Sequence, residues 1–541
     1  MNGETVARRV VRKLRDMGVR HVFGVPSGGW VDYMEALRET DGIDFVLTSH
    51  EGGASFMADV CGRLTGVPGV CFGTFGPGAT NLATGVGGAL LDRSPMIALT
   101  DEMPAAMRGR VTQMGIDHQA LFAPITKKTV RLDAANMDAI LTDAATVALE
   151  GRPGPVHVGL PSGLSAEQAG EGDMAVVAAS QPAPAAAQLD ALAAAFRGAR
   201  KPVLAIGLAA TGLGIEARIA ALAERFALPV VLTPMAKGML AESHPNYAGV
   251  LFHALSDEVG KTHVEADLVI AIGYDPVEFN YESWMRDGLA LASIDTAPVD
   301  VDRARHPIVA EVVGDIAAGL AALEAVQAPR KDWALAEVAA RKAGMFERMR
   351  PSIGHMGPCA ALEVLRDVLP QDGIMTCDVG AHTHLIGQKW ETPVPGLQIM
   401  TNGWSAMGFG LPAAIAAKLC RPDKAVCAVV GDGGFLMTVG ELATAVREKL
   451  PIVIVVLTDN DLALIRIKQQ RKQNPIYGTP VREEGTIGGP SLFGVPVTTV
   501  STPETLRAAL VEAFAADGPC IVEVLLDSRE YDGLVLRKDK P

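Results

Sequence analysis

The chain has 541 residues, which at about 100–200 residues per domain predicts about three domains. Hydrophobic residues make up 49% and charged residues 20%, a composition that supports a large core and excludes a disordered chain. The 48 basic and 62 acidic residues leave a net charge of −14, which argues against a nucleic-acid-binding protein and against docking on an anionic membrane.

The seven cysteines are scattered and none forms a CxxC pair, so they predict reduced thiols rather than a disulfide framework or a zinc site. Residues 1–18 have the pattern of an amphipathic helix and lack the apolar centre of a signal peptide. No apolar run reaches the roughly 18 residues of a membrane-spanning helix. We therefore expect a cytoplasmic protein that has neither nucleic acid nor a membrane as a partner.

Two segments divide the chain into parts of similar size, an Ala-, Gly- and Pro-rich stretch at 165–186 and a charged stretch at 328–357. The predicted domains are 1–168, 186–328 and 356–541. In chain order, the expected strands are 21–25, 44–49, 69–75, 96–100 and 155–160, then 202–207, 228–233, 268–273 and 289–295, and finally 373–380, 425–432, 451–459, 497–501 and 520–526. Apolar runs of this length between amphipathic helices indicate buried parallel strands. The expected fold class is α/β, with three doubly wound parallel sheets and sites at the carboxyl ends of the strands.

The most informative segment is 427–461, where a strand ends at Gly431-Asp432-Gly433 and a helix is expected at about 439–449. A second strand follows and ends before Asp459. Because a right-handed crossover returns this strand beside the first, both acids should lie at neighbouring carboxyl ends. The glycines would leave a helix N-terminus open to an anion, and two carboxylates suit Mg²⁺ that also binds phosphate oxygens.

Two other segments carry weaker signals. Glu51 follows an expected strand and begins a helix of small residues, so it is either a capping residue or a functional carboxylate. The segment 72–81, FGTFGPGATN, has glycines that permit close approach of another backbone or of a cofactor ring, but it lacks the GK[ST] of a P-loop.

Taken together in chain order, these and further motifs resemble the thiamine-diphosphate (ThDP) dependent enzymes of the acetolactate synthase, pyruvate oxidase and benzoylformate decarboxylase group. The motifs are GVRHVFGVPSG (18–28), HEGGASFMA (50–58), GPGATN (76–81), LPVVLTPMAKG (228–238), ADLVIAIGYDPVEF (266–279), DVGAHTH (378–384), NGWSAMGFGLPAAI (402–415) and GDGGFLMTVGELATAV (431–446). The resemblance implies a pyrimidine-binding, a middle and a diphosphate-binding domain. ALFAPITKKTV (120–130) and the segment before Trp284 resemble the catabolic acetolactate synthases.

The resemblance implies a role for individual residues. Glu51 would hydrogen-bond the cofactor's pyrimidine and favour the imino form that removes the thiazolium proton, and Met407 would hold the cofactor bent. Mg²⁺ would be bound by Asp432, Asp459 and the backbone carbonyl of Asp461. The other expected cofactor-binding residues are Gly28, Asn81, Gly380, His382, Ser405, Gly431, Gly433, Gly434 and Leu462. His118 and Gln119 are further catalytic candidates, because they align loosely with a Gln-Glu pair of the biosynthetic synthases.

The implied reaction is decarboxylation of a 2-oxo acid, with pyruvate favoured, followed by transfer of the resulting enamine to a second carbonyl. The alternatives are a decarboxylase that releases an aldehyde, a related ThDP lyase or oxidase, and a silent ThDP-binding subunit. The resemblance also implies a homodimer or homotetramer, because the cofactor lies between domains of two subunits. FAD is possible but not indicated.

The acceptor substrate is left open by residues that depart from the family pattern. Lys468 aligns with a tryptophan that shapes the second-substrate pocket of the biosynthetic synthases. With Arg466, Arg471 and Lys472 it either recognises an anionic group of the substrate or belongs to a solvated helix face. Other candidates for orienting the substrate are Ser27, Trp30, His50, Thr74 and Gln113.

Overall fold

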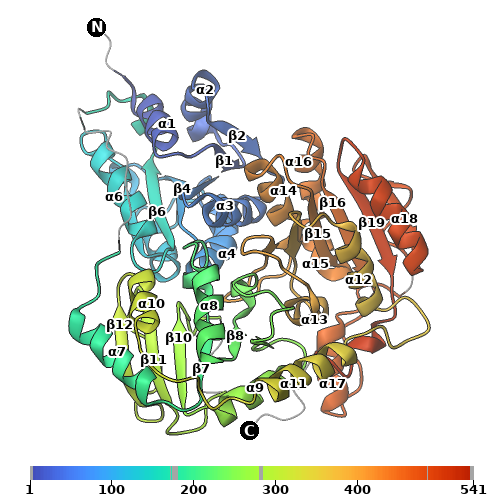
Figure 1. The fold of residues 1–541 in the computed structure, drawn as a ribbon. Helices are drawn as coiled ribbons and strands as arrows, with labels where there is room; N and C mark the ends of the chain where they lie inside the picture. The colour runs from blue at the N-terminus through green and yellow to red at the C-terminus, as the bar shows by residue number, and fades with distance from the viewer. Residues whose placement is uncertain (1–3, 171, 173–180, 279–283, 484, 536–541) are drawn as a thin grey trace.

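A computed structural model describes residues 4–170, 172, 181–278, 284–483 and 485–535. Three sheets follow one another along the chain, and helices cover both faces of each (Figure 1). Every strand pairing within the three sheets is parallel except that of the two short strands β17 and β18. The predicted α/β fold with three doubly wound parallel sheets is confirmed. Each predicted domain contains one sheet, and the boundaries 1–168, 186–328 and 356–541 remain predictions.

The N-terminal unit, from α1 to β6, has the strand order β2-β1-β3-β4-β6-β5. Its strands are β1 (His21–Gly24), β2 (Asp44–Leu47), β3 (Gly69–Gly73), β4 (Met96–Glu102), β5 (Lys128–Arg131) and β6 (Pro155–Pro161). Its helices are α1 (Val6–Asp16), α2 (Val31–Glu39), α3 (Glu51–Thr65), α4 (Pro77–Leu91), α5 (His118–Phe122) and α6 (Met137–Leu149). The sequence pattern missed β5, an edge strand whose residues are all partly or fully exposed.

The middle unit, from α7 to α10, has the order β12-β11-β10-β7-β8-β9. Its strands are β7 (Pro202–Ile206), β8 (Val230–Leu232), β9 (Tyr247–Val250), β10 (Leu268–Ile272), β11 (Ala290–Asp295) and β12 (Ile308–Val313). Its helices are α7 (Ala186–Gly198), α8 (Glu216–Phe226), α9 (Ser256–Glu265) and α10 (Ile316–Glu324), and α11 (Leu335–Arg348) leads to the next unit. The two outermost strands, β9 and β12, were not expected from the sequence.

The C-terminal unit, from α12 to β19, has the order β14-β13-β15-β16-β19-β18-β17. Its strands are β13 (Ile374–Cys377), β14 (Gln398–Ile399), β15 (Val426–Gly431), β16 (Val453–Thr458), β17 (Ser491–Leu492), β18 (Val495–Val500) and β19 (Cys520–Leu525). Its helices are α12 (Pro358–Val368), α13 (Ala381–Lys389), α14 (Gly410–Cys420), α15 (Asp432–Thr438), α16 (Leu442–Arg447), α17 (Ala463–Arg471) and α18 (Pro503–Phe514).

The helix after β15 begins earlier than predicted. We expected one helix at about 439–449, but α15 starts at Asp432, directly after the strand, and a 3₁₀ turn (Val439–Glu441) joins it to α16. Gly431 has extended backbone angles (φ −75°, ψ 155°), so no loop separates strand from helix. An aspartate in the first turn is favourable there because it complements the helix dipole.

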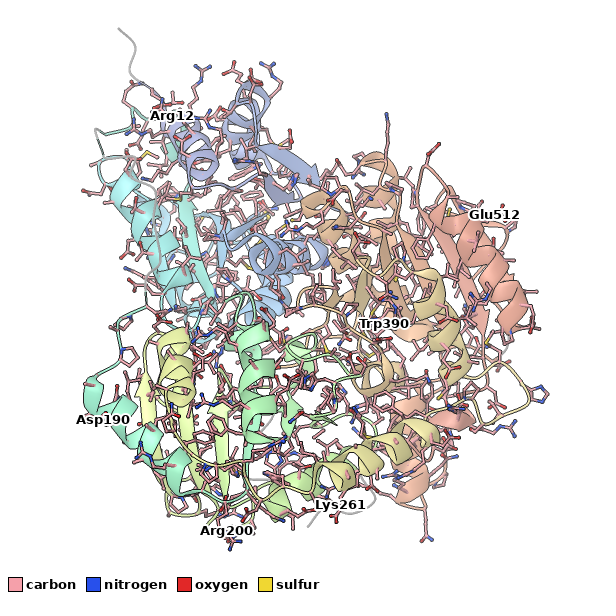
Figure 2. The ribbon with its side chains drawn as sticks, in the orientation of Figure 1. Arg12, Asp190, Arg200, Lys261, Trp390 and Glu512 are labelled. Atoms are coloured by element: carbon pink, nitrogen blue, oxygen red, sulfur yellow. The ribbon has the colours of Figure 1, made fainter. Side chains whose placement is uncertain are left out.

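The units are joined by shared apolar packing. One buried cluster runs from Val203 of the middle unit to Leu385 of the C-terminal unit. A second joins α3 to the C-terminal unit, where the rings of Phe56 and Phe409 meet edge to face at 5.6 Å. In Figure 2 the labelled charged side chains lie around the periphery, whereas Trp390 lies inside and is 2% exposed. None of the described helices combines the length and apolar character needed to span a bilayer.

Candidate active site

A cavity of about 230 Å³ lies at the carboxyl ends of β13, β15 and β16. All of its lining residues belong to the C-terminal unit, from Val379 onward. The predicted residues that line it are Gly380, His382, Ser405, Met407, Gly431, Asp432, Gly433, Gly434, Asp459, Asp461 and Leu462. The structure therefore gathers the expected metal ligands and most of the expected cofactor-binding residues in one place.

The two expected metal-binding carboxylates lie at the ends of adjacent strands, since Gly431 of β15 pairs with Leu457 of β16. Burial raises the pKa of Asp459 to about 7, and the charge of Asp432 adds to the shift. Burial also raises the pKa of Asp432. The Oδ1 atom of Asp461 is buried without a hydrogen-bond partner among the described residues. Because a divalent cation would relieve the repulsion between these oxygens, the donor set fits Mg²⁺.

The N-terminus of α15 forms the floor of the cavity. A Cβ added to Gly433 would lie 2.8 Å from Leu462, and one added to Gly434 would overlap the carboxylate of Asp378. Only glycine lets the backbone lie this close to its neighbours. The first turn of a helix has N–H groups without partners in the helix, and such a turn suits a diphosphate.

Asp378 holds the Met407 segment in place, and its role could not be seen in the sequence pattern. Its Oδ1 accepts hydrogen bonds from the backbone N–H groups of Val379, Gly408 and Phe409, at 2.8–3.2 Å. Burial raises its pKa to about 7. The only signal was its position as first residue of DVGAHTH, directly after a strand.

His382 lines the same cavity as a neutral imidazole. Burial lowers its pKa to about 4. Its Nε2 atom is buried and has no partner among the described residues, so it is available to a ligand.

Glu51 lies outside this cavity, at the first position of α3 in the N-terminal unit. Its carboxylate is 8% exposed and accepts a hydrogen bond from the Asn81 amide at 2.9 Å. The imidazole of His50 caps α3 by accepting a hydrogen bond from the N–H of Gly52, at 2.9 Å. Gly28 begins a 3₁₀ turn (Gly28–Trp30) and also lies outside the cavity lining. Within one chain, Glu51, Asn81 and Gly28 are thus separate from the expected metal site.

His118 belongs to a buried chain of hydrogen bonds that begins at the Gly76 turn. The N–H of Gly76 donates to Nε2 of His118 at 3.1 Å, so this nitrogen carries no proton. The proton of the neutral ring is then on Nδ1, which donates to the hydroxyl of Thr100 at 2.9 Å. The hydroxyl of Thr100 in turn donates to Nε2 of His157 at 2.8 Å. Burial lowers the pKa of His118 to about 4 and that of His157 to about 3.

The chain continues from His157 to Gln119 and ends at a carboxylate. Nδ1 of His157 donates to the hydroxyl of Thr129, which donates to Oε1 of Gln119, both at 2.7 Å. The amide of Gln119 donates to Glu102, which also accepts from the Arg131 guanidinium. Neither nitrogen of His118 is therefore free to exchange a proton with a substrate. The ligand atoms of Glu102, His118 and His157 lie within 4.8 Å of one another, but these hydrogen bonds already satisfy them without a metal ion.

Two further loops of the N-terminal unit converge on Asp101, at the end of β4. The hydroxyl of Ser27 donates to Asp101 at 2.5 Å and that of Thr74 at 3.3 Å. Burial raises the pKa of Asp101. Trp30 is instead a core residue, stacked on Phe72 with ring centroids 3.8 Å apart.

The cations of α17 have different surroundings. Arg466 is paired with Asp461 at 3.1 Å and with Asp532 at 3.0 Å, so it braces the loop after β16. Lys468 and Lys472 are exposed. Arg471 is exposed as well, and the exposure of these three cations is consistent with either alternative, recognition of an anionic group or a solvated helix face.

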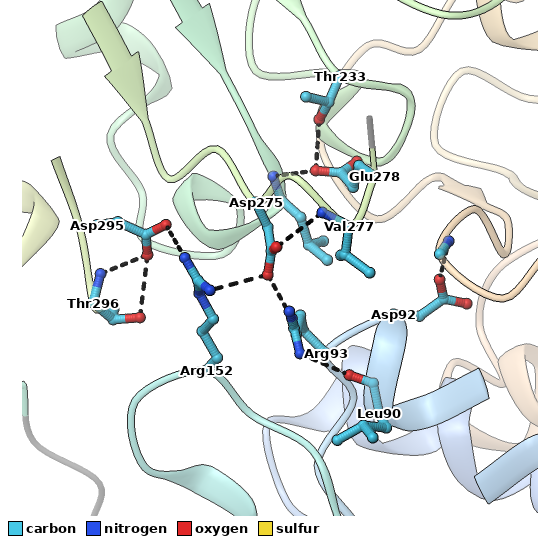
Figure 3. A network of polar contacts seen from close by, with 12 residues as sticks. Leu90, Asp92, Arg93, Arg152, Thr233, Asp275, Val277, Glu278, Asp295 and Thr296 are labelled. Carbon is cyan, nitrogen blue, oxygen red and sulfur yellow. Dashed lines mark hydrogen bonds and ion pairs between the residues drawn. The ribbon is translucent and has the colours of Figure 1, made fainter. Parts of the chain in front are cut away.

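A polar network joins the N-terminal and middle units (Figure 3). Asp275 accepts from Arg93 at 2.5 Å and lies 3.6 Å from Arg152, which reaches Asp295 at 3.4 Å. Beside it, Glu278 accepts from the hydroxyl of Thr233 at 2.8 Å, and burial raises its pKa to about 7. A cavity of about 400 Å³ next to this network is lined in part by Leu208, Ala209 and residues 211–213. Its arginines are already engaged by carboxylates, and FAD remains possible there but not indicated.

The comparisons with known proteins agree with this geometry. Three family models match in order: "Thiamine pyrophosphate enzyme, N-terminal TPP binding domain" at residues 4–121, the "central domain" at 189–323 and the "C-terminal TPP binding domain" at 378–524.

Curated relatives match along almost the whole chain. "Acetolactate synthase" of Bacillus subtilis is 31% identical, over 99% of this chain and 95% of the relative. "Acetolactate synthase isozyme 2 large subunit" of Escherichia coli is 31% identical, over 98% and 96%. "Acetolactate synthase, catabolic" of Raoultella terrigena is 30% identical, over 96% and 95%. These identities do not separate the catabolic from the other synthases. The chain belongs to the thiamine-diphosphate-dependent enzymes and is an acetolactate synthase-like carboligase or decarboxylase.

Proposed function

We propose that the protein is a Mg²⁺- and ThDP-dependent acetolactate synthase, which decarboxylates pyruvate and joins the remaining two-carbon unit to a second 2-oxo acid. The observation that carries this proposal is the near full-length similarity to proteins named acetolactate synthase, in a chain that keeps Asp432, Asp459 and Glu51. We also expect a cytoplasmic location, in keeping with seven free cysteines.

The C-terminal cavity would hold the diphosphate and the metal ion. Asp432, Asp459 and the backbone carbonyl of Asp461 would bind Mg²⁺, and the first N–H groups of α15 would bind phosphate oxygens. Met407 would pack against the cofactor's rings. ThDP, when bound, supplies a nucleophilic carbon and an electron sink for decarboxylation.

Glu51 would hold the proton that the pyrimidine ring needs. Asn81 donates to Oε2 of Glu51, which leaves Oε1 to share a proton with a ligand. The carboxylate is buried, and its Oε1 lies beside Gly78 in the first turn of α4.

His118 and Gln119 would act by positioning rather than by acid–base catalysis. Their hydrogen bonds hold Gly76, the residue before α4, whose φ of 44° and ψ of −93° are unusual. Asn81 lies in the first turns of α4, so the position of Gly76 affects the partner of Glu51.

The active unit would be a homodimer, which could pair further into a homotetramer. Among the described residues, those that line the C-terminal cavity all come from the C-terminal unit, and none comes from the N-terminal unit of the same chain. A second copy would supply Glu51 from its N-terminal unit and complete the site.

Purified protein with ThDP, Mg²⁺ and pyruvate would test the proposal, with substrate loss and products followed by NMR. Acetolactate is the expected product. Acetaldehyde would instead identify a decarboxylase. If pyruvate is not consumed, pyruvate is not the donor, and 2-oxo acids with a second anionic group are the next to test because of the exposed Lys468 and Lys472.

A further inference from the structure

Two thiols meet where the N-terminal unit packs against the C-terminal unit. Cys61 lies in α3 and Cys420 is the last residue of α14. Their sulfur atoms are 2.9 Å apart. The chain's seven cysteines all lie in the described residues, and this is the one pair whose thiols the hydrogen bonds of the structure join.

The backbone on both sides of this pair is held across the interface. The Arg421 guanidinium donates to the carbonyl of Leu64, and that of Arg63 donates to the carbonyl of Met400 at 2.6 Å. The hydroxyl of Thr65 donates to the carbonyl of Cys61 at 2.7 Å. These hydrogen bonds fix the backbone near both cysteines and so keep the two sulfurs close together. A disulfide has an S–S distance of about 2.05 Å, so they need to approach by only about 0.9 Å.

Small molecules can reach the pair. A cavity of about 120 Å³ is lined by both cysteines and by Gly18, Val67 and Pro68. Cys61 is 7% exposed, whereas Cys420 is half-buried. A peroxide is small enough for such a cavity, and it would meet Cys420 first.

The two thiols are not equivalent. The hydrogen bond from the Cys61 thiol lowers the pKa of Cys420, and the charge of Arg421 acts in the same direction. The same bond, with burial, raises the pKa of Cys61. Because Cys420 is also the more exposed of the two thiols, it is the one that attacks the peroxide, and Cys61 is the resolving thiol.

We propose that Cys61 and Cys420 are a site of oxidative modification, at which a peroxide forms a disulfide between the N-terminal and C-terminal units of one chain. The Cys420 thiol first releases its proton, and the thiolate attacks a peroxide oxygen. The O–O bond breaks, and the departing hydroxide takes up the released proton, so a sulfenic acid and water result. The Cys61 sulfur then attacks the Cys420 sulfur and expels the oxygen as a second water, which takes the Cys61 proton. Overall, two thiols and one hydrogen peroxide give one disulfide and two waters.

The disulfide would restrain the unfolded chain more than the folded one. It closes a loop from residue 61 to residue 420, and long closed loops lose the most entropy in the unfolded state. Because the folded backbone already holds the sulfurs together, we expect little strain. The oxidised protein should unfold at a temperature several degrees above that of the reduced protein.

The experiment treats the full-length protein with hydrogen peroxide, blocks remaining thiols with an alkylating reagent and maps the digested peptides by mass spectrometry. We expect a linked peptide pair containing Cys61 and Cys420 and a mass lower by about 2 Da before digestion. We also expect thermal unfolding to shift upward, and dithiothreitol to reverse both effects. This readout needs neither cofactor nor substrate, so it is independent of the proposed function.

Cys61→Ser and Cys420→Ser should each remove the link and the thermal shift. Cys520→Ser is the matched control, because this half-buried thiol has no thiol partner, and the variant should behave as the parent protein does. Recovery of both thiols in alkylated form after peroxide treatment would overturn the proposal. So would a sulfinic acid at Cys420 beside a free Cys61, or a link between two chains on a non-reducing gel.

Discussion

The N-terminal and C-terminal units use the same end of the same kind of sheet in opposite ways. In the C-terminal unit, the strand ends carry acids and glycines that surround an open cavity. In the N-terminal unit, the polar groups behind the Gly76 turn bond to one another, and the carboxylate of Glu51 lies at the start of α3, where it accepts a hydrogen bond from Asn81. The polar atoms of the first surface border a cavity, whereas those of the second are mostly bonded to one another. A shared topology thus fixes where a site lies in the sheet, whereas the hydrogen bonding of its polar atoms decides whether they are free to bind a ligand.

The largest effect is expected from Glu51→Gln. The amide keeps the shape and the hydrogen bond to Asn81 but cannot exchange a proton as the carboxyl does. Turnover should fall about 100- to 10,000-fold, the usual contribution of a general acid or base. ThDP affinity, measured by calorimetry, should stay within a few-fold of that of the parent. Glu35→Gln on the exposed face of α2 is the control, and unchanged turnover in Glu51→Gln would refute the role of Glu51.

Asp432→Asn probes the C-terminal surface. Because the substitution removes one of two adjacent carboxylates, the affinity of the site for Mg²⁺ should fall by at least about 100-fold. This loss exceeds the one usually seen when a residue that only hydrogen-bonds a metal ligand is replaced. Activity should recover partly at high Mg²⁺ concentration, which a titration of initial rate against metal would show. Asp372→Asn, a surface carboxylate paired with Lys424, should leave the titration unchanged. Equal metal dependence in both variants would contradict the assignment.

Thr100→Val tests whether the hydrogen-bond chain positions the Gly76 turn. Valine has the size of threonine but leaves one nitrogen each of His118 and His157 without a partner, at a cost of about 1–3 kcal/mol in unfolding free energy. We expect kcat to fall about tenfold, which corresponds to about 1.4 kcal/mol of activation free energy. KM should change little. Thr100→Ser restores the hydroxyl and should restore kcat. If serine fails to rescue, the effect comes from packing and not from the chain.

The smallest effect is expected in the pH dependence of unfolding. The folded pKa values of His118 and His157 lie below the ordinary value near 6.5, so the unfolded chain binds more protons as the pH falls below 7. Each histidine therefore makes the folded state less stable at pH 5 than at pH 7. Buried acids with raised pKa values, such as Asp378, act in the opposite direction, so the comparison must be made between variants. His157→Phe should lose less stability than the parent protein between pH 7 and pH 5, by thermal unfolding, and an equal loss in both would contradict this.

Most of the fold could be predicted because the central strands are continuous apolar runs. Sequence GVCFG at β3, for example, is buried along its whole length. Edge strands such as β5 and β12 were missed, since exposed residues interrupt their apolar pattern. The start of α15 at Asp432 was missed because paired glycines indicate a turn when no tertiary contact is known.

That Asp432 and Asp459 lie close together was predictable for a different reason. Asp432 and Asp459 follow two successive strands, and topology alone brings such positions together. Asp101, Asp378 and His157 could not be predicted in the same way. Their partners lie far away in sequence or are backbone groups of other segments, and nothing in the local pattern of residues marks such contacts.

The hydrogen-bond chain behind Gly76 cannot relay protons. A backbone N–H cannot become an acceptor, so the bond from Gly76 to His118 has a fixed direction, and each following bond inherits that direction. Passing a proton along the chain would reverse all of these bonds, which the first one forbids. His118 and His157 therefore relay no proton to the reaction, and isotope exchange at both rings should be slow even while the enzyme turns over.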